Sequence, residues 1–201
     1  MKRTVPIFFL LVLLSSGPYS LSASGAGEAE SSSNAVGPET ASSEETELSR
    51  LFRELGMTVF PAPREIPDFT VLSPENTPLT LSSFRGSYVF LNFWATWCPP
   101  CREEMPSMQK LHERLSGDDF VILAVSVGES LRTVTDFLGE HPYTFEIGIN
   151  SNGSLGQIYA AQGIPATYIL DRQGRVMAGR IGSRSWDDGA SLAAFSALLR
   201  D

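Results

Sequence analysis

The sequence predicts one α/β domain in which helices cover both faces of a mixed β-sheet. Apolar runs typical of buried strands alternate with segments whose apolar residues recur at helical spacing. Such alternation places parallel strands side by side, each joined to the next through a helix. The last two predicted strands are joined instead by the polar turn Asp171–Gly174, which makes that pair antiparallel. A chain of 201 residues has room for one such domain.

The segment Tyr88–Trp94 is nearly all apolar and rich in aromatic residues. Such a run is typical of a strand that is buried on both faces of a sheet. Before it, the sequence predicts a short amphipathic helix at Thr46–Leu55 that Gly56 ends, an extended stretch marked by Pro61, Pro63 and Pro67, and an edge hairpin formed by Phe69–Leu72 and Leu79–Leu81. After it, the predicted helices are Cys98–Leu115, Leu131–Leu138, Leu155–Ala161 and Leu192–Leu199, and the predicted strands are Phe120–Val127, Thr144–Ile149, Ala166–Leu170 and Arg175–Ile181.

The first residues follow the order of a secretory signal peptide. Lys2 and Arg3 precede an apolar run at Val5–Leu14, and small residues suited to cleavage come next. The run stops at Gly17, well short of the roughly 20 apolar residues that a spanning helix needs. We therefore expect residues 1–23 to be a signal peptide and the protein to be periplasmic or otherwise extracytoplasmic. The alternative is an uncleaved anchor that tethers it to the inner membrane.

Residues 24–47 are predicted to form a disordered linker, which leaves 48–201 for the folded domain. The linker consists mainly of Ser, Ala, Gly and Glu, and its few large apolar side chains cannot offset the entropy lost on ordering. The whole chain has 15 basic and 23 acidic residues, a net charge of −8. Because this charge repels phosphate backbones, we expect no nucleic-acid partner.

The two cysteines of the chain, Cys98 and Cys101, form a CxxC motif where the predicted central strand passes into a helix. A thiol at a helix N-terminus faces free N–H groups and the positive end of the helix dipole, which lowers its pKa. Pro99 and Pro100 suit the first turn, where a missing N–H costs little. Cys101 lies one turn after Cys98 on the same side, within reach of a disulfide.

Two segments resemble the TlpA/ResA-like family of exported thiol-disulfide oxidoreductases, namely FWATWCPPCREEMP at 93–106 and GIPATYILDRQG at 163–174. The resemblance extends from about Phe60 to the C-terminus. It implies a thioredoxin-like fold with an N-terminal β-hairpin extension. It also implies a protein-disulfide reductase, which for some members of the family serves cytochrome c maturation.

By this resemblance Cys98 is the attacking cysteine and Cys101 the resolving one. The expected partners are protein disulfides or dithiols, together with a membrane-bound thiol donor that reduces the pair again. The reaction needs no metal or organic cofactor besides the redox-active disulfide. We expect a monomer.

The dipeptide Ile164-Pro165 resembles the cis-proline dipeptide of the family, which lies beside the CxxC motif and presents its backbone to an extended substrate. Without the resemblance, an ordinary trans proline at a strand start would be favoured. The predicted substrate-binding residues are Trp97, Pro99, Pro100, Ile164 and Pro165. Trp94 either flanks the same surface or belongs to the core.

Glu104 follows Cys101 by one helical turn, and family members often carry a glutamate there that reaches the active site from below. The resemblance therefore implies that Glu104 exchanges a proton with the resolving thiol. The alternative is a solvated helix acid like Glu103. Asn92 stands where thioredoxins have a buried aspartate.

Three other functions fit the sequence less well. A zinc site would need His112 and His141, which are far apart in sequence. A peroxiredoxin-like thiol peroxidase, related in fold, needs Thr or Ser three residues before its reactive cysteine, where this chain has Ala95. A non-catalytic partner-binding or copper-binding module would require neither the intact CxxC motif nor the Ile164-Pro165 pair.

Overall fold

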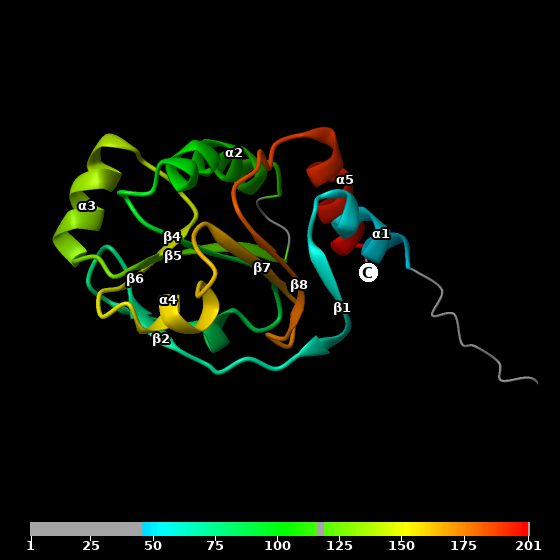
Figure 1. The fold of residues 1–201 in the computed structure, drawn as a ribbon, viewed down its shortest axis with the longest axis horizontal. Helices are drawn as coiled ribbons and strands as arrows, with labels where there is room; N and C mark the ends of the chain where they lie inside the picture. Colours follow the sequence, from blue (N-terminus) through cyan, green and yellow to red (C-terminus); the bar gives the residue numbers. More distant parts are fainter. Residues whose placement is uncertain (1–45, 116–118, 201) are drawn as a thin grey trace, which may run out of the picture. The chain divides into compact units, whose positions relative to one another are not determined.

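The computed structural model describes residues 46–115 and 119–200. Within them the strands form one sheet in the order β1-β8-β7-β4-β5-β6-β2-β3 (Figure 1). The strands are β1 Thr58–Arg64, β2 Thr70–Leu72, β3 Pro78–Thr80, β4 Tyr88–Trp94, β5 Phe120–Val127, β6 Glu146–Asn150, β7 Ala166–Leu170 and β8 Val176–Ile181. The helices are α1 Glu47–Glu54, α2 Pro99–Leu115, α3 Leu131–Glu140, α4 Ser154–Tyr159 and α5 Gly189–Leu198, with a 3-10 helix η1 at Leu81–Phe84.

The sheet is mixed, as the sequence predicts, although the antiparallel pairing of β7 with the central strand β4 was not expected. Strands β4, β5 and β6 run parallel, with Tyr88 opposite Phe120 at the start of the central pair. Strand β7 runs antiparallel to both β4 and β8. All seven residues of β4 are buried, because this strand has neighbours on both sides and helices above and below.

Alternate side chains of β4 point into two separate cores. Phe90 and Trp94 pack with α1, α2, α3 and α5 on one face, whereas Leu91 and Phe93 pack with α4 and η1 on the other. Figure 1 shows α2 and α4 on opposite sides of the sheet. The prediction of helices on both faces is confirmed, and Trp94, which is fully buried, belongs to the core.

Strand β1 is the main element that the sequence does not predict as a strand. The expected extended stretch pairs antiparallel with β8, with Thr58 opposite Gly179, and so forms one edge of the sheet. Pro61 and Pro63 are tolerated there because an edge strand leaves one side of its backbone unpaired. The predicted hairpin, β2 and β3, forms the opposite edge.

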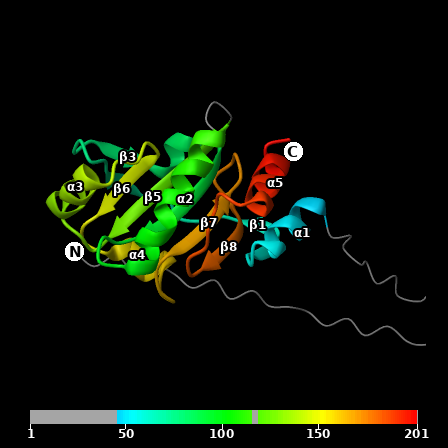
Figure 2. The ribbon, with the colours of Figure 1, turned by 90° about the horizontal axis from the view of Figure 1, so that it is seen from above.

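Helix α1 closes the core next to α5, and the two helices lie side by side in both views (Figures 1 and 2). Thr46 caps it by accepting a hydrogen bond from the Ser49 N–H, so the helix includes Glu47, the last residue of the predicted linker. Phe52 packs edge-on against Phe195 of α5, with ring centroids 5.7 Å apart. Gly56, at φ +72°, follows the helix, as expected for a residue that ends one.

The predicted signal peptide and most of the predicted linker lie outside the described residues. Within residues 46–115 and 119–200, no helix has the length and apolar character required to cross a membrane.

Candidate active site

The CxxC motif lies where β4 passes into α2. Strand β4 ends at Trp94, and α2 begins at Pro99. Cys98 and Cys101 form a disulfide, with their Cα atoms 5.3 Å apart. Cys98 keeps 4% of its surface exposed, whereas Cys101 is fully buried. Of the two sulfurs, that of Cys98 is therefore the one an incoming partner meets first.

The helix start presents a single amide to the Cys98 sulfur. Pro99 and Pro100 have no N–H, so the first amide hydrogen after Cys98 is that of Cys101. It donates to Cys98 Sγ at 3.3 Å. A thiolate at Cys98 would gain both from this hydrogen bond and from the positive end of the α2 dipole.

A distant loop completes the site from the other side. The Ile164-Pro165 peptide bond is cis, and the carbonyl oxygen of Ile164 lies 3.9 Å from Cys98 Sγ. Trp97, 66% exposed, and Ile164 line a cavity of about 440 Å³ beside the disulfide. The expected arrangement of Trp97, Cys98 and the Ile164-Pro165 pair is therefore present.

The carboxyl group of Glu104 is buried beneath this surface, with only 2% of the residue exposed. Its Oε1 accepts a hydrogen bond from Asn92 Nδ2 at 2.9 Å. Its Oε2 accepts from the Arg184 backbone N–H and from Trp186 Nε1, both at 3.3 Å. Of the two alternatives for Glu104, a solvated helix acid is therefore wrong.

Burial raises the pKa of Glu104 from 4.5 to about 7, and hydrogen bonds from Asn92, Arg184 and Trp186 oppose that rise. The desolvation of the charged form dominates, because few polar groups replace the lost water. A carboxyl group with this pKa exchanges protons readily near neutral pH.

Asn92 links Glu104 to the strand that follows the cis-proline. Its Nδ2 also donates to Thr167 Oγ1 at 3.0 Å. Asn92 stands opposite Thr167 in the β4–β7 pairing, and Thr167 follows Pro165 by two residues. One amide group thus connects the acid on α2 to β7, the strand that begins directly after the cis-proline.

Glu129 is a further buried acid at the site, and sequence reasoning missed it. It lies just beyond β5 with 7% of its surface exposed. Its Oε2 accepts from the Thr96 N–H at 2.8 Å and from Ser126 Oγ at 2.7 Å, and its Oε1 accepts from Thr96 Oγ1. Glu129 therefore fixes the loop between Trp94 and Cys98. No local motif marks it, because the contacts that place it at the site come from Thr96, which is distant in sequence.

Replacing Glu129 with alanine is expected to destabilise the protein by about 2 to 3 kcal/mol, because it leaves the donors of Thr96 and Ser126 without an acceptor. Urea unfolding of the disulfide form measures the effect. Glu103→Ala is the control, since Glu103 is exposed and its loss should change stability by less than about 0.5 kcal/mol. Equal midpoints for the two variants would contradict the role given to Glu129.

Comparison with known proteins shows the family to which this chain belongs. The model of the AhpC/TSA family matches residues 63–178, more than half of the chain. The chain is 36% identical over 123 residues to the thioredoxin-like protein YneN of Bacillus subtilis, covering 60% of this chain and 71% of that protein. The thiol-disulfide oxidoreductase ResA of Geobacillus thermodenitrificans is 38% identical over 110 residues, 55% of this chain.

The chain spans 63% of that ResA and 66% of the ResA of Bacillus thuringiensis, to which it is 32% identical over 57% of its own length. Among solved structures, StoA from Bacillus subtilis superposes with a TM-score of 0.55 at 25% identity, covering 67% of this chain and 99% of StoA. A thioredoxin family protein from Chlorobium tepidum superposes with a TM-score of 0.56 at 24% identity, covering 67% and 98%. The fold is thus thioredoxin-like, and the chain belongs to the AhpC/TSA family and, within it, to the TlpA/ResA-like thiol-disulfide oxidoreductases.

Proposed function

We propose that this protein is exported and reduces disulfide bonds of extracytoplasmic proteins with Cys98 and Cys101. The observation that carries the proposal is the position of the Cys98 sulfur. It lies just before the start of α2 and faces the Ile164 carbonyl of the cis-proline loop, and Cys98 is the member of the pair that keeps some exposed surface, 4%. A partner chain that reaches Cys98 also reaches this carbonyl group, and its backbone N–H can donate a hydrogen bond to the carbonyl oxygen.

In the forward reaction the Cys98 thiolate attacks one sulfur of a partner disulfide. The partner's S–S bond breaks, its other sulfur leaves as a thiolate, and a mixed disulfide joins Cys98 to the partner. Cys101 loses its proton and attacks the Cys98 sulfur. The second partner thiolate then leaves, so the partner has gained two electrons and the Cys98–Cys101 disulfide has formed.

We assign to Glu104 the role of accepting the Cys101 proton. Glu104 follows Cys101 by one turn of α2, and its raised pKa, about 7, suits a group that takes up a proton near neutral pH. Cys101 is buried, so its thiol needs a proton acceptor within the protein or through one water molecule.

Continued turnover requires a source of electrons outside the cytosol. A membrane-bound thiol donor is the chemical class we propose, because it can reduce the Cys98–Cys101 disulfide by the same exchange in reverse. The basic N-terminus and apolar run of the sequence support export. The reaction requires one copy of the chain and no metal or organic cofactor. The reduction of cysteines for cytochrome c maturation is one duty compatible with it.

The test is the reduction potential of the Cys98–Cys101 couple, measured by equilibrating the protein in dithiol and glutathione buffers and counting free thiols. A reductant is expected to have a potential below about −230 mV, on the thioredoxin side of the scale. A potential near about −120 mV would instead indicate an oxidant. Failure to form the intramolecular disulfide would favour metal or partner binding.

The same preparation separates disulfide exchange from peroxide reduction. Ala95, three residues before Cys98, is buried and has no hydroxyl group that could assist a peroxide at Cys98. We expect catalytic amounts of the reduced protein to leave hydrogen peroxide unconsumed. Turnover of peroxide at the rate of disulfide reduction would replace the proposed function with that of a thiol peroxidase.

A further inference from the structure

A polar side chain lies in the middle of the central strand. Asn92 is fully buried, and the rest of β4 is apolar or aromatic. An amide group in such a place costs free energy unless its donors and its acceptor find partners. Its Nδ2 donates to Glu104 Oε1 and to Thr167 Oγ1, but its Oδ1 has no hydrogen-bond partner among the residues that the structure describes. This orientation therefore leaves the acceptor of the amide unused.

The carboxyl group of Glu104 is surrounded by donors. Within the described residues its hydrogen bonds come from Asn92 Nδ2, the Arg184 backbone N–H and Trp186 Nε1. All three suit the ionised form, whose oxygens only accept. The protonated form has an O–H group that needs an acceptor. Of the groups bonded to Glu104, only the Asn92 amide also carries an acceptor, the unpartnered Oδ1.

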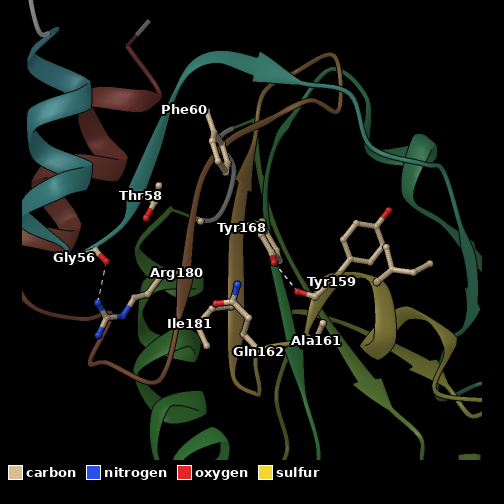
Figure 3. Close-up of a pocket in the computed structure, with 11 residues that line it drawn as sticks. Gly56, Thr58, Phe60, Tyr159, Ala161, Gln162, Tyr168, Arg180 and Ile181 are labelled. Atoms are coloured by element: carbon tan, nitrogen blue, oxygen red, sulfur yellow. Dashed lines mark hydrogen bonds between the residues drawn. The ribbon is translucent and has the colours of Figure 1, made fainter.

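Two arginines lie near Glu104, at the end of β8 and in the loop after it. Arg180 favours the ionised form through its charge, and its Nη1 donates to the Gly56 carbonyl oxygen (Figure 3). The Arg184 side chain donates to the Asp188 carboxylate. A guanidinium group has donors and no acceptor, so neither arginine side chain can receive a hydrogen bond from protonated Glu104.

Glu103 is the acidic neighbour of Glu104 on α2. The two residues line the same cavity of about 220 Å³. Glu103 is exposed, and in the described part of the chain no hydrogen bond joins the two carboxyl groups. Because water and salt screen an exposed charge, Glu103 has little influence on which form of Glu104 is favoured. The amide of Asn92 is the neighbour that can respond to the proton on Glu104.

A half-turn of this amide supplies the missing acceptor. It exchanges Oδ1 and Nδ2, which puts the oxygen where the nitrogen now lies, 2.9 Å from Glu104 Oε1 and 3.0 Å from Thr167 Oγ1. The oxygen then accepts from protonated Glu104 and from the Thr167 hydroxyl, which can either donate or accept. Each orientation leaves one end of the amide unpartnered, so the proton on Glu104 decides between them.

We propose that Asn92 is a positioning residue whose side-chain amide rotates by half a turn whenever Glu104 gains or loses its proton. The amide donates to the carboxylate and accepts from the protonated acid, so both forms keep a hydrogen bond to β4. At the same time the Thr167 hydroxyl changes from acceptor to donor, which carries the change to β7. The inference deepens the proposed function and rests on it, because Glu104 changes form in each cycle only if it takes up the Cys101 proton.

Side-chain NMR of the disulfide form tests the rotation directly. Well above the Glu104 pKa of about 7, the Asn92 amide protons should lie close to Thr167 and give a strong nuclear Overhauser effect to its Hβ. Well below that pKa, the nitrogen has turned away from Thr167. We therefore expect this effect to weaken severalfold on acidification, with an inflection near pH 7. In Glu104→Gln it should not respond to pH, because the group that selects the orientation no longer titrates.

The matched control is present in the same spectrum. Asn150 is also buried, but both ends of its amide have partners. Its Oδ1 accepts from the Leu155 N–H, and its Nδ2 donates to Asn152 Oδ1 and Ser154 Oγ. The signals of the Asn150 amide should therefore stay constant across the pH range in which those of Asn92 change.

Asn92→Asp tests the consequence for catalysis. Aspartate has nearly the same shape, but its ionised form cannot donate to ionised Glu104, and the two like charges repel. The inflection in the rate of mixed-disulfide resolution, near pH 7 in the wild type, should therefore rise by at least about one pH unit. A residue needed only for packing would not move it. Asn150→Asp, the same change at a buried asparagine of β6, should leave the inflection in place.

An Overhauser effect between Asn92 and Thr167 that stays constant with pH would overturn the rotation. An Asn92→Asp protein whose inflection stays near pH 7 would overturn the influence of Asn92 on Glu104. The NMR measurement needs no partner and no turnover, so it is decided separately from the proposed function. A reduced wild-type protein that exchanges no disulfide would overturn that function, whatever the amide does.

Discussion

Replacing Cys98 with serine is expected to lower the rate of protein-disulfide reduction by at least about a thousandfold, as does removal of other enzyme nucleophiles. Serine can form no S–S bond, and its hydroxyl is not ionised near neutral pH even beside the Cys101 N–H. The reduced protein and an excess of an oxidised protein substrate are mixed, and free thiols are counted with time.

Cys101→Ser is the matched comparison, because it leaves the attacking sulfur in place and removes only the resolving one. This variant should capture one partner molecule per chain as a mixed disulfide. Mass spectrometry detects the adduct, and added dithiol releases it. Capture by Cys98→Ser rather than by Cys101→Ser would show that the two cysteines have the opposite roles.

The central strands could be predicted from sequence because their signal is local. Tyr88–Trp94 and Phe120–Val127 begin and end as predicted, since a strand buried on both faces must be apolar at nearly every position. The sequence does not indicate β1 as a strand, because Pro61 and Pro63 disfavour a strand anywhere except at the edge of a sheet. Its pairing with β8 joins segments that only the tertiary fold brings together.

The same distinction applies to the site. Cys98, Cys101 and the cis-proline belong to short motifs that are visible in the sequence, and the structure places Cys98 beside Ile164. In the sequence Glu104 is only an acid one helical turn after Cys101. Its burial depends on Trp186 and Arg184, which come from a distant loop. No sequence motif marks Glu129. Its carboxylate accepts from the Thr96 N–H only because the fold brings the end of β5 next to the loop before Cys98.

Replacing Glu104 with glutamine is expected to remove a pH dependence from both stability and catalysis. The pKa of Glu104 is about 7 in the folded protein against 4.5 for an unperturbed carboxyl, so the folded state binds this proton more tightly than the unfolded state does. The resulting stability is fully present below pH 4.5 and is lost as the pH rises through about 7. A shift of this size corresponds to roughly 3 kcal/mol.

Urea unfolding of the disulfide forms at pH 4 and pH 8 measures the stability change. The wild type should lose roughly 3 kcal/mol more than Glu104→Gln over this interval, because glutamine does not titrate. Glu103→Gln is the matched control: Glu103 precedes Glu104 on α2 but is exposed, so its variant should retain the wild-type pH dependence. Parallel stability curves for the wild type and Glu104→Gln would contradict the raised pKa.

Catalysis distinguishes a proton acceptor from a merely buried acid. If ionised Glu104 accepts the Cys101 proton, the rate at which the mixed disulfide resolves should rise with pH through an inflection near 7. That inflection should disappear in Glu104→Gln and remain in Glu103→Gln. Glu104→Gln could instead remove the pH dependence of stability but keep the inflection in the resolution rate. The Glu104 carboxyl would then titrate in the wild type without taking part in proton transfer, and its role would be structural alone.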